Sequence, residues 1–333
     1  MKILITGVCG LIGSHLAEEL ISKNHEVIGI DNLTYGSIKN LKNIANKENF
    51  KFINCDVRCI DVDSFVSNNQ NIDVVYHLAG YFAINPNIKE LNLLNKLNIF
   101  VTQRLANECK SSSVKHFIFV SSIAACESSD NIIITEKNGS PKTHYGVAKK
   151  KAEELLLETS ANCFNVTILR PTAIFGEHHK GSIFEMVKKI KEKRFVIFGS
   201  GNSLTNFYYI RDFVDLLTTI CENKDTFNKV FIVSGDSYKL NAIVDHILTC
   251  LNYKSKIIKL PIWFGYIIAT LFEVLSFLIK KPLLFSYRRL HAMTSKVSFS
   301  NKEVSKIIHI NVKYGVLMGL TRTIKWYKKK GML

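Results

Sequence analysis

Tyr145 and Lys149 are the side chains of this sequence whose types and spacing best suit chemistry. A tyrosine and a lysine four residues apart share one face of a helix. An ammonium group close to a phenol favours the phenolate, which lowers the pKa of the tyrosine from about 10 toward neutrality. Tyr145 is then a candidate base at working pH. The pattern gains weight because Ser121 and Ser122 end an apolar run upstream.

A glycine-spaced turn near the start of the chain predicts a dinucleotide site. It follows the apolar run 2–6 and opens a helical pattern of apolar residues. Glycines permit a sharp turn and a close approach to a pyrophosphate, and the helix N-terminus supplies N–H donors and partial positive charge. We assign these residues of the turn to the cofactor: Gly7, Gly10, Leu11, Ile12 and Gly13.

The acid that ends the next apolar run favours one dinucleotide over the other. Asp31 stands near the place where such a unit puts a carboxylate on the adenosine ribose. A carboxylate accepts from a free 2′-hydroxyl but repels a 2′-phosphate, so the sequence predicts NAD. Asp56 can accept from the adenine amine, and the small Ala79 and Gly80 admit the ribose and diphosphate. Three neighbours complete this assignment: Asn32, Val57 and Leu78.

The elements that must position these residues alternate between strands and helices. Strands are predicted at 2–6, 25–31, 50–56, 73–80 and 116–122, and helices after the glycine turn, at 92–109 and at 145–159. This alternation predicts an α/β fold, a Rossmann-type doubly wound parallel sheet with a smaller C-terminal α/β substrate lobe. Ligands of such sheets bind at the carboxyl ends of the strands.

The length and hydrophobic content suit one large unit with an appended lobe. The chain has 333 residues, of which 47% are hydrophobic. We assign residues 1–170 to an NAD-binding domain, with about 205–235 returning to it. Residues 171–204 and 236–330 are assigned to a substrate-binding lobe.

Composition excludes several classes of partner. The net charge of +16 is spread along the chain, without a basic segment interleaved with aromatics, so we expect no nucleic-acid partner. The eight cysteines are scattered and form no C-x-x-C pair, which favours reduced thiols in a cytoplasmic protein. No cluster of His, Cys, Asp and Glu has the spacing of metal ligands, so we expect no metal.

One long apolar segment, 262–279, is interrupted only by Thr270, Glu273 and Ser276 and is followed by two lysines. Its length is at the lower bound for spanning a bilayer, and a glutamate inside lipid is costly. We therefore expect a buried or half-buried helix of the second lobe. The alternative is a helix on a membrane surface, with its lysines at the headgroups.

In combination, these motifs resemble the extended short-chain dehydrogenase/reductases of the NAD-dependent epimerase/dehydratase superfamily. The resemblance covers about residues 2–327. Its further motifs are Asp56-Val57-Arg58, His77-Leu78-Ala79-Gly80, Asn98 with Thr102, Arg170-Pro171 with Gly176, Gly199 with Gly201, Tyr209-Ile210-Arg211-Asp212 and Trp326-Tyr327.

The resemblance implies a role for each matching residue. Tyr145 would take a proton from a sugar hydroxyl, and Ser122 would hydrogen-bond the reacting oxygen. Lys149 would hold the nicotinamide ribose and lower the pKa of Tyr145, and Asn98 would support the cofactor region. The helices at 92–109 and 144–159 resemble those that form a homodimer interface in this family.

Departures from the family pattern narrow the activity. Nucleotide-sugar 4,6-dehydratases carry an Asp-Glu pair where this sequence has Ile123-Ala124, and neither of these side chains can move a proton. Thr205-Asn206 replace a common Arg-Asp, which removes an expected diphosphate ligand. Arg288 or Arg289 remains a candidate to clamp a diphosphate, and we assign Arg288.

The sequence therefore predicts an NAD-dependent epimerase of a sugar or nucleotide sugar, acting through a transient keto intermediate in surface-polysaccharide synthesis. The alternative enzyme is a 3β-hydroxysteroid-dehydrogenase-like oxidoreductase or keto-sugar reductase with a lipophilic or lipid-linked substrate. A non-catalytic nucleotide-binding protein is the remaining alternative. Expected partners are a small-molecule sugar substrate, a second copy of the chain, and a membrane surface contacted through 262–279.

Overall fold

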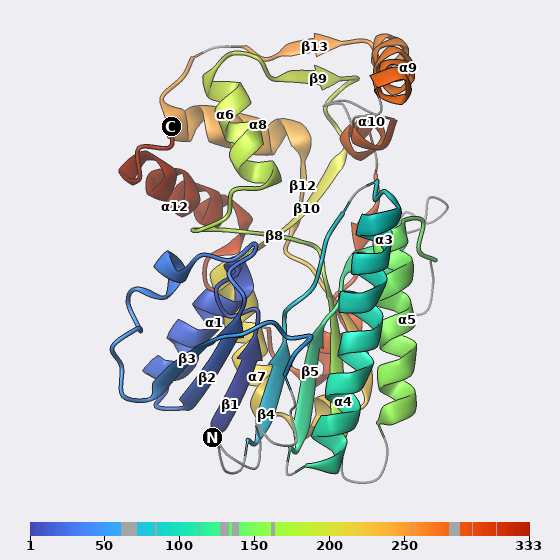
Figure 1. Cartoon of the computed structure of the whole chain (residues 1–333). Helices are drawn as coiled ribbons and strands as arrows, with labels where there is room; N and C mark the ends of the chain where they lie inside the picture. The colour runs from blue at the N-terminus through green and yellow to red at the C-terminus, as the bar shows by residue number, and fades with distance from the viewer. Residues whose placement is uncertain are drawn as a thin grey trace.

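The computed structural model describes residues 1–60, 72–83, 85–112, 114–126, 133–134, 140–160, 164–254, 256–279, 287–294, 296–310 and 312–333. Two layers of helices enclose a central sheet, and an outer lobe lies beyond the carboxyl ends of its strands (Figure 1). We use "outer lobe" for α6 (Ser182–Lys191), β9 (Val196–Phe198), α8 (Leu240–Leu251), β13 (Ile258–Leu260), α9 (Ile262–Ile279) and α10 (Tyr287–Thr294).

The central sheet has seven strands in the order β11-β7-β5-β4-β1-β2-β3. All of its neighbouring pairs are parallel. Because the order reverses between β1 and β4, the crevice for a ligand lies at their carboxyl ends. The predicted Rossmann-type fold is confirmed. The bounds are β1 (Lys2–Thr6), β2 (Glu26–Asp31), β3 (Phe50–Asn54), β4 (Val74–His77), β5 (His116–Val120), β7 (Asn165–Pro171) and β11 (Lys229–Val233).

Alternate residues of the central strands feed two separate cores. Ile3 and Ile5 pack with α1 (Leu11–Ser22) and α7 (Ile210–Glu222) on one face. Leu4 packs on the other face with α4 (Val101–Ser111) and α5 (His144–Thr159). Side chains alternate across a strand, so an apolar run such as Ile3-Leu4-Ile5 is buried only where both faces are covered.

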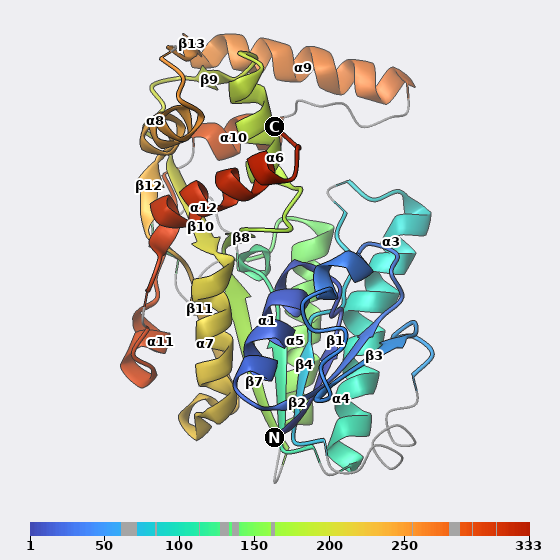
Figure 2. The ribbon, with the colours of Figure 1, turned by 90° about the vertical axis from the view of Figure 1, so that its left-hand side faces the viewer.

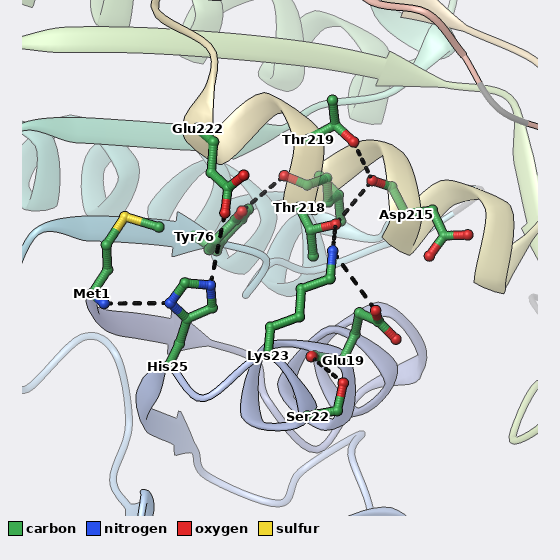
Figure 3. Close-up of polar contacts among 11 residues, drawn as sticks. Met1, Glu19, Ser22, Lys23, His25, Tyr76, Asp215, Thr218, Thr219 and Glu222 are labelled. Carbon is green, nitrogen blue, oxygen red and sulfur yellow. Dashed lines mark hydrogen bonds and ion pairs between the residues drawn. The ribbon is translucent and has the colours of Figure 1, made fainter.

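Polar contacts pin α1 against α7 (Figure 3). Lys23 Nζ donates to Thr218 Oγ1 (2.9 Å) and pairs with Glu19 (3.7 Å). From the sheet below, the buried Tyr76 hydroxyl donates to the Leu217 carbonyl oxygen (2.8 Å). These contacts hold α1, and with it the glycine turn at its start, against the sheet.

The predicted helix at 92–109 begins earlier than expected. It is built from α3 (Ile88–Asn95), a π-helical turn η2 (Lys96–Phe100) and α4. The Asn87 side chain accepts from the Glu90 N–H and the Glu90 side chain from the Asn87 N–H, a capping box that starts the helix at Ile88. The π turn brings Asn98 into the buried site, and such turns are frequent at functional positions.

A three-stranded sheet of β8 (Ala173–Phe175), β10 (Leu204–Tyr209) and β12 (Ser237–Lys239) connects the central sheet to the outer lobe. The C-terminal helix α12 (Gly315–Lys329) packs along α8 and β10. Its first turn is fixed by the Asp212 carboxylate, which accepts from the N–H groups of Lys313, Tyr314 and Gly315 (2.8–3.1 Å). The division into domains at residue 170 stays a prediction.

The helix predicted at 262–279 forms with those bounds as α9. Full burial, one of the expected alternatives, is wrong, because most of its side chains are exposed. Among the residues described, no helix has both the length and the apolar character needed to cross a membrane. The remaining elements are η1 (Ile38–Leu41), η3 (Ile123–Ala125), β6 (Ile133–Ile134), η4 (Lys224–Thr226), β14 (Ser298–Phe299) and α11 (Lys302–Ile307).

Candidate active site

The turn between β1 and α1 has the form that a pyrophosphate requires. Gly7 has a φ of +74°, and a Cβ added there would lie 2.9 Å from the backbone nitrogen of Ala79. A Cβ on Gly13 would collide with the carbonyl oxygen of Gly7. Gly10 is the N-cap of α1 and has no side chain that could accept a hydrogen bond from the first N–H groups of the helix. The N–H groups of Leu11 and Ile12 are among these. These donors are available to an anion.

Asp31 ends β2 beside this turn. Its Oδ2 accepts from the Cys9 N–H (3.0 Å) and its Oδ1 from the Leu33 N–H (2.8 Å). The carboxylate is 9% exposed and so is held in one orientation. Each oxygen has a further lone pair, which leaves Asp31 able to accept from a ribose hydroxyl.

Asp56 and Asn32 meet at the neighbouring strand ends. Asn32 Nδ2 donates to the Asp56 carboxylate (2.8 Å), which also receives the Arg58 guanidinium (2.7 Å). Arg58 holds the pKa of Asp56 well below its usual range, so this acid is ionised at neutral pH. Val57 is buried next to it, where it can form an apolar wall.

A buried hydrogen-bond chain shapes the end of β4, and sequence reasoning did not identify it. Thr6 Oγ1 accepts from the Leu78 and Ala79 N–H groups (3.2 Å each) and contacts His77 Nδ1 (2.8 Å). His77 Nε2 lies 3.0 Å from Thr102 Oγ1. Burial lowers the pKa of His77 to about 3, so the imidazole is neutral. The sequence did carry a signal for this chain, because Thr6 and His77 are polar residues that end apolar strands.

Gly80, Asn98 and Lys149 come together beyond β4. A Cβ on Gly80 would lie 2.8 Å from Asn98 Oδ1 and 3.8 Å from Lys149 Nζ. Asn98 is 1% exposed and exchanges two hydrogen bonds with the backbone of Tyr81 (2.7 and 2.9 Å). The predicted residues of this edge therefore lie in one place.

Lys149 lies between the end of β5 and Tyr145. Its Nζ donates to the Val120 carbonyl oxygen (3.0 Å) and stands 5.9 Å from the centre of the Tyr145 ring. Burial lowers the pKa of Lys149 to about 8, although Glu153 opposes the shift. The ammonium form still dominates at neutral pH.

The pKa of Tyr145 differs from the expectation based on Lys149. Burial raises it to about 12, because the phenolate is poorly solvated there. The Lys149 ammonium, 5.9 Å from the centre of the Tyr145 ring, does not reverse this effect. The lowering of this pKa that was expected from Lys149 is therefore wrong for the protein by itself, and the positive charge of a nicotinamide would act in the lowering direction.

The segment η3, which Ser122 caps, and the start of α5, which carries Tyr145, approach each other closely. The Ser122 hydroxyl accepts from the Ala124 N–H (3.2 Å) as N-cap of η3. A Cβ on Gly146 would collide with the Ala124 carbonyl oxygen, so only glycine after Tyr145 allows this approach. Thr143 caps the start of α5 by accepting from the Gly146 N–H (3.0 Å).

The neighbouring Ser121 points into a buried ion pair instead. Its hydroxyl donates to Glu153 Oε1 (2.5 Å), and the Glu153 carboxylate binds the Arg170 guanidinium at 2.6 Å. Both charged side chains are at most 3% exposed. Arg170 thus ties β7 to α5, and Ser122 is the serine that remains for a substrate.

The diphosphate ligand predicted from the outer lobe is not tested. Arg288 belongs to α10, but its side chain lies outside the described residues. Asn206, which replaces a family acid, donates to the Val297 carbonyl oxygen (2.7 Å) and accepts from Ser237 Oγ (2.7 Å). It therefore has a structural role in β10. The described part of the chain contains no group of three or more potential metal ligands.

The parallel sheet, glycine turn, acid at the end of β2 and Ser-Tyr-Lys arrangement define a dinucleotide-binding protein of the short-chain dehydrogenase/reductase type. Residues 3–234 match the model of the NAD dependent epimerase/dehydratase family, and the chain belongs to this family. The family, the enzyme class and the NAD cofactor expected from the sequence are confirmed.

Relatives and solved structures extend the similarity over the whole chain. An uncharacterized UDP-glucose epimerase of Bacillus subtilis is 31% identical over 66% of this chain and 72% of its own length. The N-acetyl-alpha-D-glucosaminyl-diphospho-ditrans,octacis-undecaprenol 4-epimerase of Escherichia coli O157:H7 is 24% identical over 98% and 95%. The structure of UDP-glucuronic acid 4-epimerase from Bacillus cereus, with UDP-glucuronic acid and NAD, aligns at a TM-score of 0.80, with 23% identity over 99% and 100%.

Proposed function

We propose that this protein is a cytoplasmic NAD-dependent epimerase that inverts a carbon of a diphosphate-linked sugar for surface-polysaccharide synthesis. One observation carries the proposal. Ser122, Tyr145 and Lys149 gather at the carboxyl end of β5 beside the cofactor turn, whereas the η3 positions 123 and 124 hold no acid or base. The three side chains can therefore serve to oxidise and reduce a carbinol, and the two positions that carry the eliminating acids in 4,6-dehydratases hold Ile123 and Ala124.

Each residue of the site has its own proposed role. Tyr145 takes the proton of the sugar hydroxyl, and Ser122 donates a hydrogen bond to the same oxygen. Lys149 holds the nicotinamide ribose and adds positive charge near the phenol. When bound, NAD would supply the acceptor and, once reduced, the donor of the hydride. Tyr145 would return the proton to the same oxygen. Asp31 and the glycine turn hold the adenosine and pyrophosphate, and Asp56 with Asn32 borders the adenine.

The nucleotide-sugar relatives and the lipid-linked 4-epimerase support inversion at C4 of a sugar diphosphate. The exposed apolar surface of α9 favours a second candidate, a dehydrogenase or keto-sugar reductase with a lipophilic substrate. The two differ in their use of cofactor. An epimerase regains its hydride acceptor in each cycle and can keep its NAD, whereas a dehydrogenase must exchange it.

Mass spectrometry of the protein purified without added cofactor tests the choice. We expect about one NAD for each chain and inversion of a UDP-sugar without added cofactor. An empty protein that consumes added cofactor with a keto sugar would identify the second candidate.

Tyr145→Phe tests the catalytic assignment. We expect a loss of epimerisation by roughly 10²- to 10⁴-fold with NAD still bound, because only the phenolic hydroxyl is removed. Tyr253→Phe, the same change after α8, is the matched control and should leave the rate unaltered. Full activity in Tyr145→Phe would contradict the assignment of the base.

We also propose a homodimer through α4 and α5. α5, which packs beside α4, carries exposed apolar side chains at Val147 and Leu157, and Phe100 of η2, directly before α4, is 64% exposed. The other expected partner is a membrane surface, which α9 would contact.

A further inference from the structure

The helix α9 presents an apolar surface to solvent at the end of the molecule. It runs along the outer lobe, far from the N-terminus and the central sheet (Figure 2). One narrow face packs on the lobe: a Cβ on Gly265 would lie 2.7 Å from Leu290 and 2.9 Å from Phe198, and Ala269 is fully buried. The exposed apolar side chains are Ile262 (39%), Trp263 (61%), Phe264 (38%), Tyr266 (51%), Ile267 (47%), Leu271 (63%), Val274 (55%), Leu275 (48%), Leu278 (68%) and Ile279 (44%).

The polar side chains of α9 do not interrupt this surface evenly. Thr270 Oγ1 is hydrogen-bonded to the Tyr287 hydroxyl, and Glu273 accepts from the Tyr287 N–H (3.1 Å). Both groups are therefore turned toward the start of α10. On the rest of α9, the described side chains that are exposed are apolar. Exposed apolar patches of this kind mark interaction surfaces.

The charge around α9 identifies the chemistry of the partner. Between residues 254 and 296 the sequence has one acid, Glu273. The same stretch has eight basic residues: Lys254, Lys256, Lys259, Lys280, Lys281, Arg288, Arg289 and Lys296. An apolar helix flanked by basic residues, with aromatic side chains at one end, fits the boundary between anionic headgroups and acyl chains.

A second copy of the chain fits this surface poorly. In a two-fold symmetric interface the same patch meets itself. The excess of basic residues in 254–296 would then face an equal excess on the partner. The exposed apolar side chains of η2 and α5, Phe100, Val147 and Leu157, offer a copy of the chain a separate surface.

We propose that α9 docks the protein peripherally on an anionic lipid bilayer. The outer face around Leu271, Leu275 and Leu278 enters the acyl boundary, and the exposed lysines before α9, Lys254, Lys256 and Lys259, contact the headgroups. This places the outer lobe, and hence the carboxyl edge of the central sheet, on the membrane side of the molecule. The inference rests on α9 alone and goes beyond the proposed epimerase activity.

Flotation of the full-length protein with vesicles tests it. The probes are vesicles of phosphatidylcholine alone and of phosphatidylcholine with phosphatidylglycerol. We expect flotation with the mixed vesicles that weakens at high salt, release of the bound protein by alkaline carbonate, and a loss of binding of about tenfold or more in the double variant Leu271→Glu/Leu275→Glu. Met318→Glu, which puts the same charge on an exposed apolar position of α12, is the matched control and should float like the wild type.

Three results would overturn the proposal. They are no flotation of the wild type, equal flotation of the double variant, or retention after carbonate. A double variant that no longer forms the wild-type oligomer would instead assign α9 to contact between copies. Inversion of a soluble UDP-sugar, measured without vesicles, should be unchanged in the double variant. A protein that floats but inverts no sugar would refute the proposed function and leave this inference standing.

Discussion

Glu153 is the side chain on which the geometry after β5 depends most. It accepts from Ser121 and pairs with Arg170, and its position four residues after Lys149 places a negative charge near the ammonium group. Ser122 directly follows Ser121, and Lys149 lies one helical turn before Glu153 on α5. The Glu153 carboxylate therefore fixes the two segments that carry Ser122 and Lys149. The charged pair therefore positions groups of the site without touching a substrate.

Glu153→Gln should destabilise the protein by about 3–5 kcal/mol, because a buried guanidinium loses its carboxylate. Urea denaturation measures the change. The control is Glu154→Gln, since Glu154 pairs with Lys151 on the exposed side of the same helix, and its loss should cost about 0–1 kcal/mol. An equal loss of unfolding free energy in the two variants would show that the buried ion pair stabilises the protein no more than the exposed one.

Lys149 gives the folding stability a defined pH dependence. Burial lowers its pKa to about 8 from the ordinary 10.5, so between these values the unfolded chain binds more protons. Stability therefore rises with pH across this window. In NAD-free protein, the free energy of unfolding of the wild type relative to Lys149→Met should increase by roughly 1–3 kcal/mol between about pH 7 and pH 9.5. Urea denaturation at both pH values measures it.

Lys150→Met is the control for this pH dependence, because Lys150 is the next residue on α5 and is only partly buried. The difference in free energy of unfolding between Lys150→Met and the wild type should be the same at both pH values. A constant difference for Lys149→Met as well would refute the contribution of Lys149.

The turn from β1 into α1 is the element that must accommodate the cofactor most closely. Gly7→Ala combines a left-handed backbone with a Cβ next to Ala79, whereas Gly331→Ala has a φ of +64° and no atom within 4 Å. Backbone strain alone costs about 1–2 kcal/mol. We expect Gly7→Ala to exceed Gly331→Ala in lost stability and to lose bound NAD. Denaturation and cofactor content measure the two effects, and NAD retention with equal destabilisation would contradict the prediction.

The molecule presents two different groups of exposed apolar side chains, one on η2 and α5 and one on α9. Phe100→Glu should convert the proposed dimer to a monomer, because a charge would be buried without a partner in the four-helix contact. Light scattering after gel filtration measures the mass. Met318→Glu should stay dimeric, and a monomeric wild type or a dimeric Phe100→Glu variant would refute this interface.

The sequence alone determined the features that depend on neighbouring residues. Five of the seven strands of the central sheet, the glycine turn, the end of β2 at Asp31 and the helices α5 and α9 followed from period, glycine spacing and polar boundaries. The pairing of Tyr145 with Lys149 on one face followed from helix geometry. These patterns are local, and the structure has each of them.

Only the tertiary structure decided how distant segments alter these residues. In the folded chain Ser121 bonds the Glu153–Arg170 pair, burial raises the pKa of Tyr145, α3 begins at Ile88, and α9 stays exposed. Burial and pairing depend on what packs against a residue from elsewhere in the chain. An apolar run can therefore predict the helix α9 but not whether the protein covers it.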